Sequence, residues 1–114
     1  MTAQLDTLAA MVVRAGAPKL PSQAVDEAFR ALGGWSLVDG ALARTFRWPD
    51  WRATMAFVNA VSDLANEVDN HPDLEVGWGR CTVRWSTHDA GGITQNDLAC
   101  AARTELIARR SQAK

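Results

Sequence analysis

The stretch Leu74–Thr87, LEVGWGRCTVRWST, decides the fold class, because apolar and polar residues alternate along it almost without a break. The apolar positions of this alternation are Leu74, Val76, Trp78, Cys81, Val83 and Trp85. Gly77 and Gly79 mark a turn between the two halves. A period of two is typical of strands that bury one face, so the stretch predicts a half-buried β-hairpin.

A second hairpin and a long helix precede this stretch. Residues 35–48, WSLVDGALARTFRW, read as two strands around Asp39-Gly40, a strong two-residue turn signal. Asp50 is then a suitable N-cap for a helix that runs through residue 69. One apolar stripe of this helix comprises Ala53, Phe57, Val61, Leu64 and Val68. Pro72 cannot continue a helix, so the chain is expected to leave it before the hairpin begins.

A helix is also predicted at each end of this central part. Ser22 is the expected N-cap of the first, which carries Val25, Phe29 and Leu32 on one face and ends at Gly33-Gly34. Thr94, with Asp97 three residues later, opens the last helix in a capping-box pattern, and this helix extends to about residue 110.

The chain is expected to form one domain with an N-terminal extension, because 114 residues leave no room for a second core. Residues 1–20 form the extension, in which 3–15 can make a short helix, and residues 21–114 form the domain. The predicted order α-β-β-α-β-β-α indicates an α+β fold. It is a single four-stranded antiparallel sheet, made of two β-hairpins, with three main helices packed on one face.

Composition excludes several classes of function. A formal net charge of −1 is unsuited to a nucleic-acid surface that neutralises phosphates. No apolar run approaches the ~18 residues of a membrane span. Two cysteines, Cys81 and Cys100, make no disulfide framework and favour a reducing, cytoplasmic location. Without C-x-x-C or H-x-x-x-H spacing, no metal site is expected.

The two histidines are the main candidate functional residues. His71 precedes the second hairpin and His88 follows it, and the two ends of a hairpin are neighbours in space. Three carboxylates, Asp69, Asp73 and Asp89, bracket the pair and can orient the imidazoles. Histidines at helix and strand ends are also common capping and turn residues, so both interpretations remain open at this point.

The last helix has apolar residues on two sides. Leu98, Ala101, Ala102 and Leu106 form one face, and Cys100 and Ile107 lie on another. Because a helix that is apolar on two sides usually packs against two partners, the pattern predicts self-association.

The segment ANEVDNHPDLEVGWGRCTVRWSTHDAGGITQNDLACA resembles the signature of the pterin-4a-carbinolamine dehydratase family. The resemblance runs without a gap from about Gly34 to Ala108. The family has a His-His-Pro after a long helix, an aromatic residue in the next strand, a Ser-Thr-His-Glu/Asp and an Asp opening the last helix. The matching residues here are Asn70-His71-Pro72, Trp78, Ser86-Thr87-His88-Asp89 and Asp97.

The resemblance implies the activity and its residues. Members dehydrate a 4a-hydroxytetrahydropterin to a quinonoid dihydropterin, use no cofactor besides this substrate, and assemble as homodimers or homotetramers. Catalytic roles carry over to His71 and His88, and substrate-binding roles to Asn70, Pro72, Trp78, Thr87 and Asp89.

One residue departs from the family pattern. Asn70 stands where the family has the first His of the pair, and an amide has no proton to exchange at neutral pH. The departure leaves an alternative open: a non-catalytic scaffold that serves as a coactivator or as a protein assembly factor, for example for RuBisCO in the carboxysome.

Overall fold

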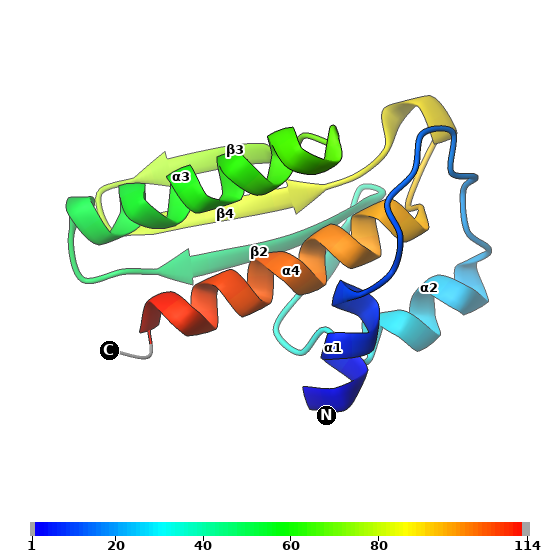
Figure 1. The fold of residues 1–114 in the computed structure, drawn as a ribbon, viewed down its shortest axis with the longest axis horizontal. Coiled ribbons are helices and arrows are strands. Elements are labelled where there is room, and N and C mark those ends of the chain that lie inside the picture. Colours follow the sequence, from blue (N-terminus) through cyan, green and yellow to red (C-terminus); the bar gives the residue numbers. More distant parts are fainter. Residues whose placement is uncertain (1, 113–114) are drawn as a thin grey trace.

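The computed structural model describes residues 2–112, and its elements follow the predicted order (Figure 1). The helices are α1 (Thr2–Ala9), α2 (Ser22–Phe29), α3 (Trp51–Val68) and α4 (Gln95–Gln112), with one 3-10 turn, η1 (His88–Ala90). The strands are β1 (Ser36–Val38), β2 (Ala41–Arg47), β3 (Asp73–Gly77) and β4 (Arg80–Trp85). The predicted α+β class is confirmed. Helix α1 is the short helix of the N-terminal extension, but it ends at Ala9 and not at residue 15.

The four strands form one antiparallel sheet in the order β1-β2-β4-β3. The second strand of each hairpin therefore lies in the centre, where Leu42 pairs with Trp85 and Phe46 with Cys81. All three apolar residues of β4 are fully buried, whereas Trp78, at the β3–β4 turn, is 66% exposed. The predicted half-buried hairpin is confirmed, and the exposed half belongs to the edge strand and its turn.

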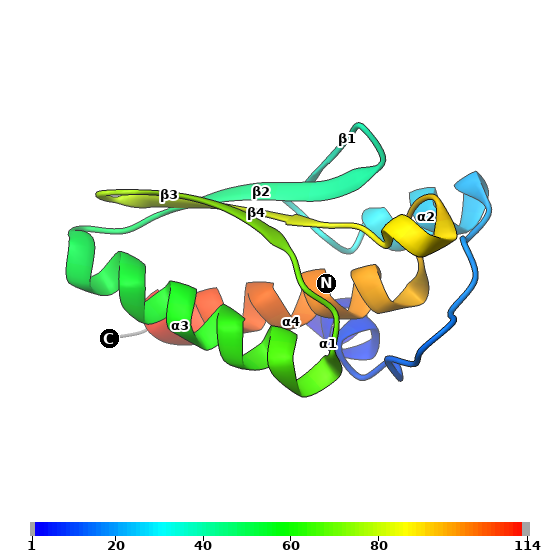
Figure 2. The ribbon, with the colours of Figure 1, turned by 90° about the horizontal axis from the view of Figure 1, so that it is seen from above.

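Helices α3 and α4 cover one face of the sheet, and α1 lies against α4 on the side away from it (Figure 2). The predicted stripe of α3 supplies Phe57, Val61 and Leu64 to the core. Leu5 and Leu8 of α1 belong to the same core cluster. The N-terminal extension is therefore packed onto the domain.

Local signals set most of the helix and turn boundaries. The Asp50 carboxylate accepts a hydrogen bond from the Ala53 N–H at 2.8 Å, which confirms the predicted N-cap of α3. Asp39 and Gly40 both have positive φ angles, of 50° and 76°, as a two-residue hairpin turn requires.

The prediction for α2 was wrong at both ends. Pro21 is the N-cap, without a side-chain hydrogen bond, and Ser22 is the first helical residue. Proline has its φ fixed at −60°, a value suited to the entrance of a helix, and this position is one residue before the predicted cap. The helix ends at Phe29, and turns occupy the four residues before Gly34. Val25 and Leu32 are nevertheless buried, as the apolar spacing predicted.

The second apolar side of α4, Cys100 and Ile107, is only partly covered within the chain. Cys100 is fully buried, and α4 as a whole packs against α3, the sheet and α1. Helix α1 thus gives α4 one partner inside the chain, and self-association stays a prediction. Leu106 and Ile107 remain half-buried.

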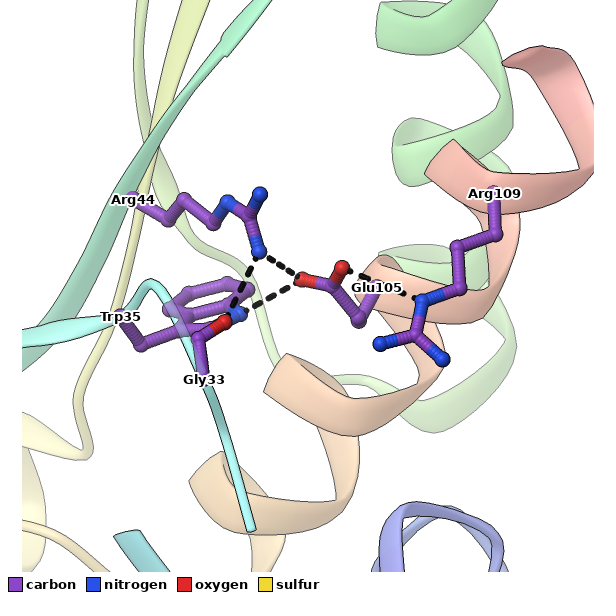
Figure 3. Close-up of polar contacts among 5 residues, drawn as sticks. All are labelled: Gly33, Trp35, Arg44, Glu105 and Arg109. Atoms are coloured by element: carbon purple, nitrogen blue, oxygen red, sulfur yellow. Dashed lines mark hydrogen bonds and ion pairs between the residues drawn. The ribbon is translucent and has the colours of Figure 1, made fainter. Parts of the chain in front are cut away.

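A charged cluster joins α4 to the β1–β2 side of the sheet (Figure 3). Glu105 accepts a hydrogen bond from the Trp35 indole N–H at 3.0 Å and pairs with Arg44 at 2.6 Å. Arg109 lies 3.4 Å from its other oxygen, and Arg44 also donates to the Gly33 carbonyl. This carboxylate is 5% exposed and has a cationic partner on each oxygen.

Within residues 2–112, no helix is long and apolar enough to cross a bilayer. The same part of the chain holds no group of three or more His, Cys, Asp and Glu side chains arranged to bind a metal ion.

Candidate active site

A cleft of about 700 Å³ lies where the C-terminal end of α3 meets the loop after β4. This volume is typical of small-molecule sites. Five of the predicted site residues line it: Asn70, His71, Thr87, His88 and Asp89. The hairpin argument is therefore confirmed in its geometry, since residues from both ends of the β3–β4 hairpin meet in one cleft.

The end of α3 turns Asn70 and His71 in different directions. Asp69 adopts the left-handed conformation with φ 53°, and the next N–H, of Asn70, donates to the Ala65 carbonyl at 3.2 Å. The Asn70 amide is half-buried and donates toward Asp97 at 3.4 Å. His71 is exposed, and its Nε2 lies 3.2 Å from the Asn66 side-chain oxygen.

Asp97 lies behind Asn70 and Thr87, outside the cleft lining, and is fully buried. One carboxylate oxygen accepts from the Thr87 hydroxyl at 2.7 Å and from the Thr94 backbone N–H at 2.9 Å. Burial raises the pKa of Asp97, although these hydrogen bonds and that of Asn70 act in the opposite direction. Asp97 is thus joined to two cleft residues, Thr87 and Asn70, by neutral donors.

A cysteine also contacts Asn70 at this inner end of the cleft. The Asn70 amide nitrogen lies 3.6 Å from the Cys100 sulfur. Burial raises the pKa of Cys100 to about 11, so its thiol stays protonated at neutral pH and is no nucleophile.

The loop after β4 presents the second histidine. Thr87 and Gly92 exchange backbone hydrogen bonds, which close the loop that contains η1. Gly91 has φ 77°, a conformation that glycine adopts without strain. His88 and Asp89 are both exposed at the cleft.

Three residues of the sequence hypothesis do not line this cleft. Trp78 lies at the opposite end of the hairpin, where its carbonyl accepts a hydrogen bond from the Thr54 hydroxyl at 2.9 Å. Pro72 and Asp73 leave the cleft as the chain enters β3. A contact between Trp78 and a ligand in this cleft is therefore not made within one chain.

One wall of the cleft was not predicted from the sequence. Residues 15–19 and Asn96 also line it. Asn96 holds the backbone of Arg14 through two hydrogen bonds, at 3.0 and 2.8 Å. An amide that binds backbone groups 82 residues away has no signature in the sequence, so no local signal would have found this wall.

The cleft combines groups suited to proton transfer with groups suited to ligand orientation. Two imidazoles can donate or accept protons near neutral pH, and the amide, hydroxyl and carboxylate groups around them can hold a polar heterocycle.

A family model described as pterin 4 alpha carbinolamine dehydratase matches residues 18–107. The chain belongs to this family.

Two relatives illustrate how similar this chain is to other members of the family. The relative from Chromobacterium violaceum is 44% identical over 95 residues, which are 83% of this chain and 88% of the relative. The relative from Stenotrophomonas maltophilia K279a is 48% identical over 91 residues, 78% of each chain. Both carry the name pterin-4-alpha-carbinolamine dehydratase, provisionally assigned, so the related chains bear the name of a hydro-lyase.

Two solved structures share the fold. The crystal structure of a transcriptional coactivator/pterin dehydratase from Brucella melitensis has a TM-score of 0.76 at 32% identity, covering 79% of this chain and 98% of that one. A pterin dehydratase-like protein identified as a RuBisCO assembly factor in the alpha-carboxysome has a TM-score of 0.54 at 23% identity. That match covers 65% of this chain and 86% of the other, and it supports the fold alone.

Proposed function

We propose that this chain dehydrates a 4a-hydroxytetrahydropterin to the quinonoid dihydropterin and that His71 and His88 carry the proton transfers. The observation that supports this most directly is that both histidines line one cleft in a chain of this family. No cofactor is needed, because the pterin itself is the substrate.

The reaction needs one acid and one base. The 4a-hydroxyl leaves as water after it takes a proton from an imidazolium, and the N5–H proton passes to a neutral imidazole as the new double bond forms. Hydrogen and oxygen balance without an oxidant or a reductant. Imidazoles are suited to both steps, because their ordinary pKa lies near neutral pH.

Asn70 and Asp97 are proposed to orient the substrate rather than to exchange protons with it. The Asn70 amide can donate to the departing hydroxyl or accept from the ring, but it does not ionise. Asp97 acts through Asn70 and Thr87, to which it is hydrogen-bonded. Asp97 is therefore a positioning residue, with Thr87 and Asp89 presenting polar groups at the cleft itself.

The alternative is a scaffold without catalysis that serves an assembly partner such as RuBisCO or acts as a coactivator. It is favoured by a single observation, namely that Asn70 replaces the first histidine of the family pattern. In that case the cleft would have no reason to retain affinity for pterins.

The deciding experiment measures two quantities on the purified chain: pterin binding by fluorescence titration, and the rate of dehydration of a 4a-hydroxytetrahydropterin above the uncatalysed rate. Binding with a rate increase supports the enzyme. Absence of pterin binding would reject the enzyme proposal and favour the scaffold.

Oligomeric state belongs to the same proposal. A homodimer or homotetramer is expected from the family. In such an assembly, the Trp78 side chain of one copy can contact a ligand in the cleft of another copy, which it does not reach within its own chain. Light scattering at micromolar concentration that shows only a monomer of about 12.4 kDa would reject both statements.

A further inference from the structure

The segment from residue 10 to 20, here called the N-terminal strap, joins α1 to α2 and runs beside the first half of α4 toward the loop after β4 (Figure 1). Its first residues are held from α4. The Arg103 guanidinium donates to the carbonyl of Ala9, just before the strap, at 2.8 Å and to that of Met11 at 2.9 Å.

Further along, the strap is fixed at two more points. Asn96 accepts from the Arg14 N–H and donates to the Arg14 carbonyl, which locks both backbone groups of that residue. The Leu20 N–H donates to the Ile93 carbonyl at 2.9 Å. Residues 15–19 are thus held between two anchored positions, and they form a defined wall of the cleft.

This wall is largely an addition to the family domain. The family match begins at residue 18, so the cleft-lining residues Ala15, Gly16 and Ala17 lie before it. Ala17 is 4% exposed and belongs to the buried set, which ties the wall to the domain beneath it.

Lys19 brings a positive charge to this wall. Its stem lies across Gly92, where an added Cβ would meet the Lys19 Cε at 3.0 Å. The missing side chain of Gly92 therefore lets the lysine lie against the loop that also carries His88 and Asp89. Among the described residues 2–112, none forms a hydrogen bond or ion pair with the Lys19 ammonium group.

We propose that Lys19, held at the cleft by the N-terminal strap, selects pterins whose side chain at C6 carries a negative charge. This inference rests on the proposed function, because it takes the cleft to be a pterin site. Lys19 is the one Lys or Arg side chain among the described residues that line the cleft. The two carboxylates there, Asp69 and Asp89, are suited instead to the N–H donors of the pterin ring.

The test uses two stable fluorescent pterins that differ in charge at C6, 6-carboxypterin and 6-hydroxymethylpterin. In the full chain, Lys19→Gln is expected to weaken 6-carboxypterin binding about threefold to fivefold, the range of a solvent-exposed ion pair. Binding of 6-hydroxymethylpterin should change by less than about twofold, because it presents no charge to the lysine. Lys19→Arg should keep the wild-type preference, and added salt should reduce it.

Arg14→Gln is the matched control. It removes one positive charge from the same strap but lies outside the cleft lining, so the ratio of the two dissociation constants should stay at the wild-type value. An equal loss for both pterins in Lys19→Gln, no loss for either, or the same loss in Arg14→Gln would overturn the assignment. If wild type binds neither pterin, the proposed function fails as well. Binding of both with no effect of Lys19 overturns this inference alone.

Discussion

Two carboxylates on α4, Asp97 and Glu105, are buried to almost the same degree but have partners of different kinds. Asp97 is 0% exposed and Glu105 is 5% exposed. Glu105 contacts two arginines and an indole N–H (Figure 3), whereas Asp97 accepts from a threonine hydroxyl, an amide and a backbone N–H.

The partners of a buried carboxylate distinguish a structural role from a candidate functional one on the same helix. The charge of Glu105 is compensated by Arg44 and Arg109. None of its partners lines the cleft. No cation among the described residues pairs with Asp97, and burial raises its pKa. Two of its neutral partners, Asn70 and Thr87, line the cleft. Equal burial does not imply an equal role. The nature of the partners decides.

The largest expected effect concerns the cleft side of this comparison. His88→Ala should lower the dehydration rate by about 10²–10⁴, because it removes a group that transfers a proton in the transition state. Steady-state kinetics of 4a-hydroxytetrahydropterin dehydration gives the measurement, with circular dichroism as a check of folding. His71→Ala, the companion variant, should also lower kcat, because His71 is proposed as the other proton-transfer group. Equally small effects of both changes would show that neither histidine is catalytic.

The next effect concerns the structural side. Glu105→Gln should lower the free energy of unfolding by about 2 kcal/mol, because Arg44 and Arg109 lose their shared counter-charge. The estimate is below that of a fully buried pair, since both arginines are partly exposed. Chemical denaturation is the measurement.

The matched control for Glu105 is Glu75→Gln. Glu75 pairs with Arg84 at 3.3 Å on the surface of the sheet, and its side chain is 65% exposed. Loss of the Glu75–Arg84 ion pair should change the free energy of unfolding by less than about 0.5 kcal/mol. If both variants lose the same stability, the cluster around Glu105 is no more than another surface ion pair.

The sequence predicted the structural side of the molecule better than the functional side. Alternation in β4 and the stripe of α3 report burial directly, because strands and helices have fixed periods. The convergence of His71 and His88 also followed from hairpin geometry. By contrast, Ser22 was predicted to be the N-cap of α2, a position that Pro21 occupies. Adjacent candidates for one helix boundary differ by a single residue, and the sequence does not separate them.

The parts that sequence missed depend on contacts between distant segments. Asn96 and Arg103 read as ordinary polar residues of α4, and only the fold reveals that they hold the N-terminal strap. The packing of α1 against α4 was not predicted either, because the two helices are distant in the sequence. Trp78 was placed at the cleft by resemblance, while the hairpin carries it to the opposite end.

A third prediction asks whether Asp97 can be given a stronger partner. Asn70→His places an imidazole where the amide now meets Asp97, and it should raise the dehydration rate about tenfold, a cautious part of what one acid-base group supplies. The double variant Asn70→His with Asp97→Asn should lose most of this gain, because the new imidazole then lacks its carboxylate. A gain that is independent of Asp97 would contradict the positioning role proposed for it.

The last prediction concerns the effect of Asp97→Asn on the free energy of unfolding, which is expected to be small and to depend on pH. Asp97→Asn keeps an oxygen for the Thr87 hydroxyl and the Thr94 N–H, and the Asn70 amide can flip to accept from the new NH₂ group. The change in unfolding free energy should therefore stay within about 1 kcal/mol, far from the loss expected for Glu105→Gln.

The sign of that change follows from the raised pKa of Asp97. Since the folded-state pKa lies above the ordinary value of 3.8, the protonated form favours folding, and its contribution is fully present only below that value. The contribution is lost as pH rises through the folded-state pKa, because the unfolded chain then ionises at lower cost. Wild type should thus lose stability relative to Asp97→Asn between pH 4 and neutral pH, and thermal unfolding midpoints of the two proteins across that range give the measurement. A difference that stays constant with pH would mean that Asp97 ionises as freely in the fold as outside it, and the contrast with Glu105 would then lie only in geometry.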